Sequence, residues 1–367
     1  MRIAAISDVT IGYGTPQIPA LVSSVAGHFG GDVSILEPAQ PELPPRHDHF
    51  PFFQFHRIAT TVHPHSVPGR AEYVWHGARI LNQLRPDVLI VGCTYSLPVL
   101  FKLRRRPELV IYYCLESVPF YGPFDVELNR HLDGRADVVI FPEENRAVME
   151  VSRSGFHGIS KVVMLNATSH AADLPAIRPR AARNGRILYA GTINRDQTFA
   201  DYFTDRRMSD FAIDMFGPLR FGDAGQRNGF LQALLSNVRY HGTLGADRLN
   251  AIRGDYIYSL VAWNPTNENQ RFAAPNKLFE SIAAGVPPIA APHPQCQEII
   301  HRHRCGVVMD DWSFDAFRHA IHRALALYET DVWDRMVANC ARAARLELNW
   351  DAQFQKLLPY LTPRKHG

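Results

Sequence analysis

The 367-residue sequence lacks the features that mark secreted, membrane-spanning and nucleic-acid-binding proteins. Its five cysteines are widely spaced without a Cys-x-x-Cys pair, which predicts neither a disulfide framework nor a thiolate zinc site. No apolar run reaches the roughly 18 residues of a spanning helix, and the first residues show no signal-peptide pattern. The net charge of +3 is too small for a nucleic-acid-binding face. We therefore expect a cytoplasmic protein with no nucleic-acid partner, whose only membrane contact is peripheral, at the cytoplasmic face.

Two short signatures of cofactor and metal sites are missing as well. Gly12 and Gly14 follow an apolar run, but Gln17 stands where the dinucleotide fingerprint Gly-x-Gly-x-x-Gly needs its third glycine. This disfavours a nicotinamide-dependent oxidoreductase. The two glycines remain candidate donor-binding residues, because backbone there can approach a phosphate or an acceptor closely, although a flexible turn would have the same sequence. The histidines within 47–65 and 293–303 lack the helical spacing of zinc ligands, so we expect no metal site among them. Since the dinucleotide fingerprint is missing as well, we expect no required cofactor.

What the sequence does contain is an alternation of short apolar runs and amphipathic stretches. Continuous apolar runs of this length predict strands covered on both faces, as in parallel sheets. In the N-terminal half they cover 3–7, 32–36, 88–92, 109–113, 138–141 and 162–165, with helical spacing at 18–28, 71–84 and 144–153. In the C-terminal half they cover 187–190, 211–216, 238–241, 256–262, 288–290 and 306–309. The pattern predicts an α/β protein built from two doubly wound, Rossmann-like domains.

Two changes of composition divide the chain. Residues 38–68 are rich in Pro, His and Phe and predict a long irregular loop of the kind that often binds ligands. Residues 171–185 interrupt the alternation with prolines and arginines and predict the interdomain linker. We therefore expect domains over 1–170 and 186–345, and a C-terminal helix within 346–367.

The segment 263–287 carries the clearest chemistry. Asn276 and Lys277 stand at an expected helix start, and Glu280 follows one turn later on the same face. A helix N-terminus and a lysine attract an anion, and a glutamate can accept hydrogen bonds from the vicinal hydroxyls of a ribose. Pyrophosphate and ribose together describe a nucleotide sugar. A structural helix capped by Asn276 would have the same spacing.

The same segment resembles a known signature. Its residues Pro275-Asn276-Lys277-Leu278-Phe279-Glu280, followed by Ala283-Ala284-Gly285-Val286-Pro287, are similar to the donor site of family 4 and related GT-B glycosyltransferases. Further pieces in that family's order are Tyr189-Ala190-Gly191-Thr192, Phe216-Gly217-Pro218, Tyr240-His241-Gly242-Thr243-Leu244 and Trp350-Asp351. The resemblance implies the GT-B fold, in which an N-terminal acceptor domain and a C-terminal nucleotide-sugar domain face each other across a cleft and the last helix returns to the first domain.

The resemblance also implies roles for individual residues. Glu280 would hold the ribose, Lys277 and Arg195 would neutralise the diphosphate as catalytic groups, and the reaction would proceed with retention and without a metal. The implied donor-binding set also contains Gly191, Thr192, His241, Gly242, Thr243, Leu244 and Asn276. Many family members place a second glutamate eight positions before the ribose-binding one, where this sequence has Phe272. Glu268 and Asn269, from the same loop, are the candidate substitutes.

On the acceptor side, Glu116 follows the expected strand 109–113 and is a candidate acceptor contact or proton acceptor, although a solvent-facing loop acid would look the same. The sequence as a whole predicts a glycosyltransferase. It would move a sugar from a nucleoside diphosphate to a saccharide, a lipid-linked saccharide or another hydroxyl acceptor, in polysaccharide or glycoconjugate synthesis. A sugar-nucleotide 2-epimerase and a non-catalytic nucleotide-sugar-binding protein are the alternatives.

Overall fold

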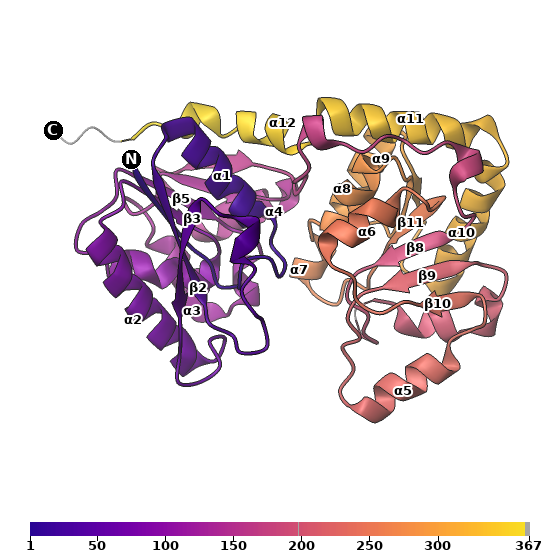
Figure 1. Ribbon diagram of the computed structural model, residues 1–367, viewed down its shortest axis with the longest axis horizontal. Coiled ribbons are helices and arrows are strands. Elements are labelled where there is room, and N and C mark those ends of the chain that lie inside the picture. The colour runs from indigo at the N-terminus through magenta and orange to yellow at the C-terminus, as the bar shows by residue number, and fades with distance from the viewer. Residues whose placement is uncertain (197, 364–367) are drawn as a thin grey trace. The chain divides into compact units, whose positions relative to one another are not determined.

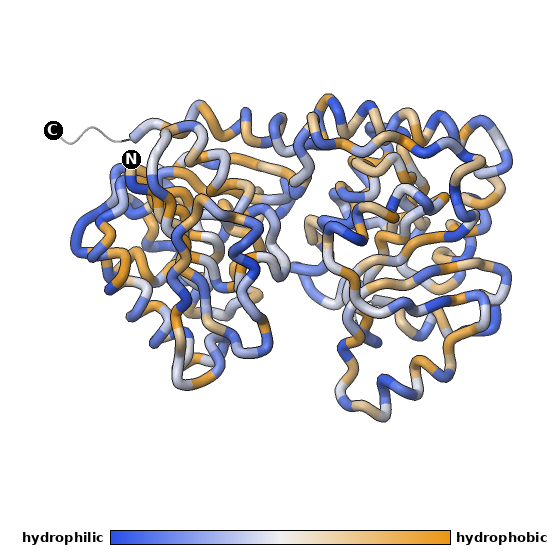
Figure 2. Tube along the Cα trace, in the orientation of Figure 1, coloured by the Kyte–Doolittle hydropathy of each residue, from blue (hydrophilic) through white to orange (hydrophobic). Residues whose placement is uncertain are grey.

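The computed structural model describes residues 1–196 and 198–363, which form two compact units (Figure 1). The first unit contains Met1–Thr168 and the described part of the tail from Gln353, and the second contains Ser169–Ala352. Each unit has its own buried apolar core around a parallel sheet. Figure 2 shows hydrophobic stretches running through the strands of both units.

The first unit is built on a seven-stranded parallel sheet with the strand order β3-β2-β1-β4-β5-β6-β7. Its strands are β1 (Arg2–Ile6), β2 (Asp32–Pro38), β3 (Phe53–Ile58), β4 (Val88–Val91), β5 (Leu109–Tyr113), β6 (Val138–Phe141) and β7 (Ser160–Val163). The order of the strands reverses between β1 and β4, which places a topological switch point at the carboxyl ends of these two neighbours.

Four α-helices connect these strands: α1 (Gln17–Phe29), α2 (Val67–Leu84), α3 (Pro123–Arg130) and α4 (Glu144–Ser154). Two of them begin with a side-chain cap. The hydroxyl of Ser66 accepts a hydrogen bond from the backbone N–H of Gly69 at the start of α2. The carboxylate of Glu143 accepts one from Arg146 N–H at the start of α4.

Strand β3 is a correction to the sequence interpretation, which treated 38–68 as irregular throughout. Phe53–Ile58 pairs in parallel with β2, with Ile58 opposite Pro38. It is one of the two edge strands of the sheet, and most of its side chains are only partly buried. An edge strand tolerates polar residues such as Gln54, His56 and Arg57, so it carries no continuous apolar run to mark it.

The second unit repeats the architecture with six parallel strands in the order β10-β9-β8-β11-β12-β13. They are β8 (Ile187–Ala190), β9 (Ile213–Phe216), β10 (Val238–Tyr240), β11 (Tyr258–Val261), β12 (Pro288–Ala290) and β13 (Val307–Val308). Its helices are α5 (Ala224–Ala233), α6 (Ala246–Arg253), α7 (Glu268–Arg271), α8 (Asn276–Ala283), α9 (Pro294–His303), α10 (Phe314–Tyr328) and α11 (Asp331–Leu346). Here the strand order reverses between β8 and β11.

The chain passes between the units twice. The first passage ends at Ser169, where the second unit begins, and the segment 171–185 belongs to that unit. Within it, the Arg183 guanidinium donates to the carbonyls of Tyr256 at 2.8 Å and Gly285 at 3.0 Å. Helix α12 (Trp350–Gln355) starts in the second unit and ends in the first, where Gln353 accepts a hydrogen bond from Leu165 N–H at 2.9 Å.

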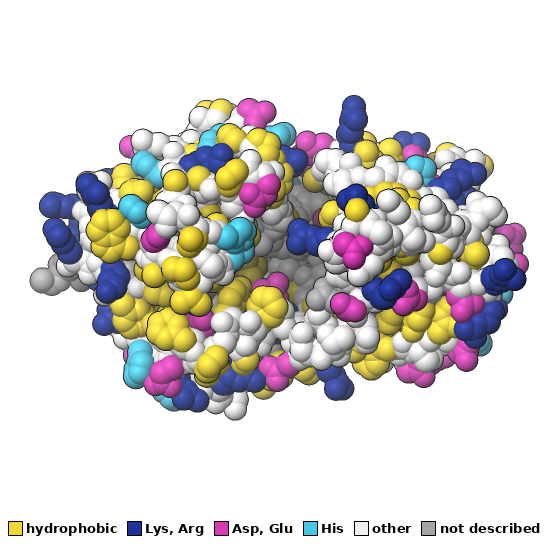
Figure 3. Space-filling model, turned by 90° about the horizontal axis from the view of Figure 1, so that it is seen from below, with side chains coloured by type: hydrophobic (Ala, Val, Ile, Leu, Met, Phe, Trp, Pro, Cys, Tyr) yellow, Lys and Arg dark blue, Asp and Glu magenta, His cyan; other side chains and the backbone are white. Residues whose placement is uncertain are grey.

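Surface charge is dispersed. On the face that Figure 3 shows, Lys, Arg, Asp and Glu side chains are scattered over the surface, and several Lys and Arg side chains lie together at the left edge of the view. Within 1–196 and 198–363, no helix is both long enough and apolar enough to cross a membrane.

Candidate functional site

The second unit contains a pocket of about 400 Å³ beyond the carboxyl ends of β8 and β11. Because the strand order reverses between these two strands, this is where open α/β sheets bind ligands. The pocket is lined by Ala190, Gly191, Thr192, Thr198, Leu249, Trp263, Gln270, Ala273, Pro275, Asn276, Lys277 and Glu280. Five of the candidate residues therefore share one cavity: Gly191, Thr192, Asn276, Lys277 and Glu280.

The floor of the pocket is a glycine turn at the end of β8. Gly191 has a φ of +152° and donates its N–H to the Phe216 carbonyl at 2.9 Å. Gly217, with a φ of +137°, packs so closely that a Cβ there would lie 1.9 Å from the Gly191 carbonyl oxygen. The two glycines let the ends of β8 and β9 approach each other and leave backbone exposed to a ligand.

Lys277 is the basic side chain in the lining of the pocket. It lies in the first turn of α8, and its Nζ stands 4.9 Å from the ring centre of Tyr189 and 5.3 Å from that of Trp263. Burial lowers the pKa of Lys277 to about 8. No carboxylate of the described chain lies within ion-pair distance of this amine. An anion bound beside it would restore the charged form.

The N-terminus of α8 adds to this field. Pro275 occupies the N-cap position and makes no side-chain cap hydrogen bond, so the helix does not begin with Asn276 as its cap. The first-turn N–H groups of a helix without a side-chain cap carry a partial positive charge and can receive an anion. Helix α8 and Lys277 thus act on the same side of the pocket.

Glu280 is held by a buried arginine that the sequence analysis missed. The Arg253 guanidinium, at the end of α6, donates to Glu280 Oε2 at 2.6 Å. The Arg253 side chain is 1% exposed and that of Glu280 is 31% exposed. Nε and Nη1 of Arg253 are buried without a hydrogen-bond partner, and burial lowers the pKa of Arg253 while Glu280 raises it. One carboxylate oxygen is thereby fixed while the group stays open to the pocket.

The loop after β11 is fixed by a buried histidine. His293 stacks on Trp263 with ring centres 3.8 Å apart, and its ring nitrogens lie 3.1 Å from the Trp263 carbonyl and 3.3 Å from the Arg271 carbonyl. Burial lowers the pKa of His293 to about 4, so the ring is neutral at physiological pH. Trp263 therefore has the imidazole stacked on it and the Lys277 amine 5.3 Å from its ring centre. Over the described residues, no group of three or more His, Cys, Asp or Glu side chains could hold a metal ion.

Several candidate residues of the second unit lie outside the lining of this pocket. Arg195 is 56% exposed and pairs with Asp201 at 3.1 Å. His241 stacks on Phe216 at 4.7 Å and lies 3.2 Å from an Asp214 oxygen, at the start of the turn that continues through Gly242, Thr243 and Leu244. Glu268 and Asn269 lie on α7, which contributes Gln270 to the pocket instead.

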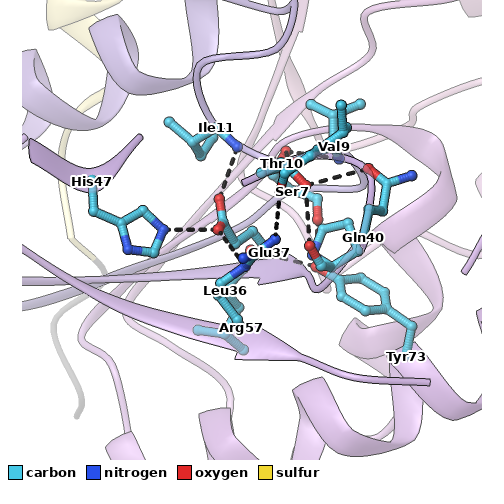
Figure 4. Close-up of polar contacts among 12 residues, drawn as sticks. Ser7, Val9, Thr10, Ile11, Leu36, Glu37, Gln40, His47, Arg57 and Tyr73 are labelled. Carbon is cyan, nitrogen blue, oxygen red and sulfur yellow. Dashed lines mark hydrogen bonds and ion pairs between the residues drawn. The ribbon is translucent and has the colours of Figure 1, made fainter. Parts of the chain in front are cut away.

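The remaining candidates belong to the first unit. Gly12 and Gly14 have φ values of +90° and +89° in the loop after β1. Figure 4 shows how the fully buried Glu37 fixes this loop: its carboxylate accepts from Ile11 N–H at 2.8 Å and lies 2.8 Å from His47 Nε2. The same carboxylate pairs with Arg57 at 3.3 Å. The glycine loop is therefore a fixed element.

Glu116 lines a different pocket, also of the first unit. Its side chain is 44% exposed and lies 3.4 Å from the buried Arg146 guanidinium. The position of Glu116 after β5 could be predicted from the sequence. Its pocket could not, because the other lining residues include residues from distant parts of the chain.

No protein-family model matches the chain, and no curated protein matches its sequence. Among solved structures, sucrose-phosphate synthase from Thermosynechococcus elongatus has a TM-score of 0.73 at 17% identity, covering 98% of both chains. HepE from Anabaena, in complex with UDP and glucose, has a TM-score of 0.72 at 12% identity, covering 98% of this chain and 99% of its own. WaaG, a glycosyltransferase involved in lipopolysaccharide biosynthesis, has a TM-score of 0.64 at 13% identity, covering 96% and 98%. The expected fold class is thus confirmed: the chain has the GT-B fold, with two doubly wound parallel-sheet units.

Proposed function

We propose that the chain is a glycosyltransferase that binds a nucleoside diphosphate sugar in the pocket of the second unit. The observation that carries the proposal is the pairing of two groups on one face of α8. Lys277 is a cation without a carboxylate partner, and Glu280 is a carboxylate fixed by Arg253. A diphosphate suits the first group, and the vicinal hydroxyls of a ribose suit the second. The likeness to HepE, whose structure holds UDP and glucose, supports the same ligand class.

In this proposal different groups around the pocket bind the diphosphate, the base and the sugar of the donor. The backbone at Gly191 and the start of α8 receive the diphosphate together with Lys277. The turn 241–244 contacts the base, and Glu268 or Asn269 serves the sugar in place of the glutamate that Phe272 replaces. Arg195 joins the diphosphate after leaving Asp201, with which it now pairs.

The chemistry follows from where charge develops. As the bond between the anomeric carbon and the diphosphate breaks, negative charge grows on the departing phosphate oxygens. Lys277 and the α8 N-terminus stabilise that charge more strongly in the transition state than in the ground state, which accelerates the reaction. The acceptor, bound by the first unit, forms the new bond to the anomeric carbon through its hydroxyl oxygen and gives up the hydroxyl proton, for which Glu116 is the candidate acceptor. We infer retention and independence of a metal from the resemblance to family 4.

The proposed setting is polysaccharide or glycoconjugate synthesis in the cytoplasm, with a saccharide or lipid-linked saccharide as the acceptor. A lipid-linked acceptor would bring the protein to the membrane surface only peripherally.

Thermal unfolding in the presence of UDP, GDP, ADP, dTDP and NAD tests the proposal. A ligand at a hundredfold its dissociation constant adds about 2.7 kcal/mol to the free energy of unfolding. We expect a clear rise in Tm with at least one nucleoside diphosphate and none with NAD. A rise with NAD alone, or with none of the five, would contradict the proposal. If one nucleoside diphosphate raises the Tm, incubation with the matching nucleotide sugar is the next assay. Slow hydrolysis would indicate a transferase, and its absence would indicate a non-catalytic binding protein.

A further inference from the structure

The first unit has a pocket of its own at its topological switch point. Its volume is about 400 Å³, and its lining includes Asp8 after β1, Cys93 after β4 and Glu116 after β5. These three strands are neighbours in the sheet, and the strand order reverses between β1 and β4. Open α/β sheets bind ligands at such a reversal, so this pocket is a candidate ligand site like that of the second unit.

The centre of this pocket is Asp8. Burial raises the pKa of the Asp8 carboxyl, against the opposite effects of a hydrogen bond to Cys93 and of the nearby His65. His65 reaches the same turn, because its Nε2 lies 2.8 Å from the Asp8 carbonyl oxygen. The His65 ring packs edge-on against Tyr95, with ring centres 5.2 Å apart, and both rings line the cavity. Asp8 therefore shares the cavity with the aromatic rings of His65 and Tyr95.

Thr15 supplies an independent sign of a missing ligand. Its Oγ1 is buried and has no hydrogen-bond partner, and Thr15 also lines the pocket. Its φ of +39° is unusual for a β-branched residue. A buried hydroxyl without a partner costs stability unless something binds to it, and backbone strain of this kind concentrates at ligand sites.

The charges around the cavity limit what can enter it. None of the lining residues in the described chain is a lysine or an arginine. Two guanidinium groups outside this lining have carboxylate partners: Arg70 pairs with Asp125 at 2.8 Å, and Arg146 with Glu116 at 3.4 Å. Asp8 and Glu116 accept hydrogen bonds, whereas a phosphate needs donors and cations. Among the lining residues of the described chain, a phosphorylated group would meet two carboxyl groups and neither a lysine nor an arginine.

We propose that this pocket binds an uncharged, hydroxyl-bearing ring, the sugar at the reacting end of the acceptor, and rejects a phosphorylated one. Asp8 and Glu116 accept hydrogen bonds from ring hydroxyls, and Thr15 completes the polar set. Tyr95 and Tyr121 also line the cavity and offer apolar contact to the C–H side of a sugar ring. The pocket as an acceptor site rests on the proposed transferase function, but the discrimination against phosphate rests on the pocket alone.

Saturation-transfer NMR on the full chain tests this inference, with the methyl glycosides of glucose, galactose and mannose and with glucose 6-phosphate as probes. We expect at least one methyl glycoside to bind and glucose 6-phosphate to bind more weakly than it. Asp8→Asn and Thr15→Val should each weaken glycoside binding by about five- to tenfold, the effect of one lost or weakened hydrogen bond. The exposed Asp133→Asn, the same change outside the pocket, should leave it unaltered.

Three results would overturn the inference: no glycoside binds, glucose 6-phosphate binds as tightly as the best glycoside, or neither pocket variant weakens binding. Melting curves with nucleoside diphosphates, recorded on the same variants, separate this failure from failure of the proposed function. The rise in Tm depends on the second unit, so it should persist in Asp8→Asn and Thr15→Val. If it is present while glycoside binding fails, only the acceptor subsite is refuted.

Discussion

The pocket of the second unit should bind its diphosphate with a pH dependence set by Lys277. Burial between Tyr189 and Trp263 lowers the pKa of this amine to about 8, so close to a tenth of it is neutral at pH 7 and about nine tenths at pH 9. Only the charged form attracts a diphosphate. The affinity should therefore fall about tenfold between pH 7 and pH 9, which corresponds to about 1.4 kcal/mol, and then tenfold for each further pH unit.

Isothermal titration calorimetry with the nucleoside diphosphate that raises the Tm, from pH 6.5 to 9.5, measures this dependence. Lys277→Arg is the matched control, because a guanidinium stays charged over the whole range. Titration of the ligand itself affects both proteins equally, so the difference between their profiles reports Lys277. Lys277→Ala should bind weakly at every pH. Parallel profiles for the wild-type protein and Lys277→Arg would refute the assignment of Lys277 to the diphosphate.

Three further predictions concern the same unit. Glu280→Ala should lower the free energy of unfolding by about 2–3 kcal/mol in urea denaturation, because Arg253 is left buried without its counter-charge; a loss below about 0.5 kcal/mol would contradict this. Arg253→Met should abolish most of the preference for a ribonucleoside diphosphate over its 2′-deoxy analogue, measured as a ratio of Kd values, and an unchanged ratio would show that Arg253 does not orient Glu280. Gly217→Ala should lower both the Tm and the affinity for the diphosphate, because its Cβ would strike the Gly191 carbonyl. The control, Gly229→Ala within α5, should raise the free energy of unfolding by about 0.5–1 kcal/mol. Similar effects of the two substitutions would count against the close packing of Gly217 on Gly191.

The central strands could be predicted from the sequence because burial on both faces leaves them no polar residues. Val88–Val91 and Val138–Phe141 are fully buried and read as continuous apolar runs. The edge strand β3 is not buried on both faces and contains polar residues. Without a continuous apolar run, it could not be told apart from the irregular region around it.

The same distinction applies to the pocket. Lys277 and Glu280 lie three residues apart on one helix, so their common face follows from the helical repeat alone. Arg253 lies 27 residues before Glu280, and only the packing of α6 near α8 brings the two side chains together. The pairing of Arg195 with Asp201 and the distance of Glu268 from the pocket lining are likewise consequences of loop geometry. Local periodicity predicts contacts within an element, and tertiary contacts of this kind leave no spacing in the sequence.

A crystal structure of the chain with a bound nucleoside diphosphate would show which cavity holds the donor. We expect the ligand in the pocket of the second unit, with the diphosphate at Gly191 and Lys277. A ribose hydroxyl should be hydrogen-bonded to Glu280 while Arg253 keeps its contact with that carboxylate. Density for the ligand in any other cavity, or a ribose turned away from Glu280, would contradict it.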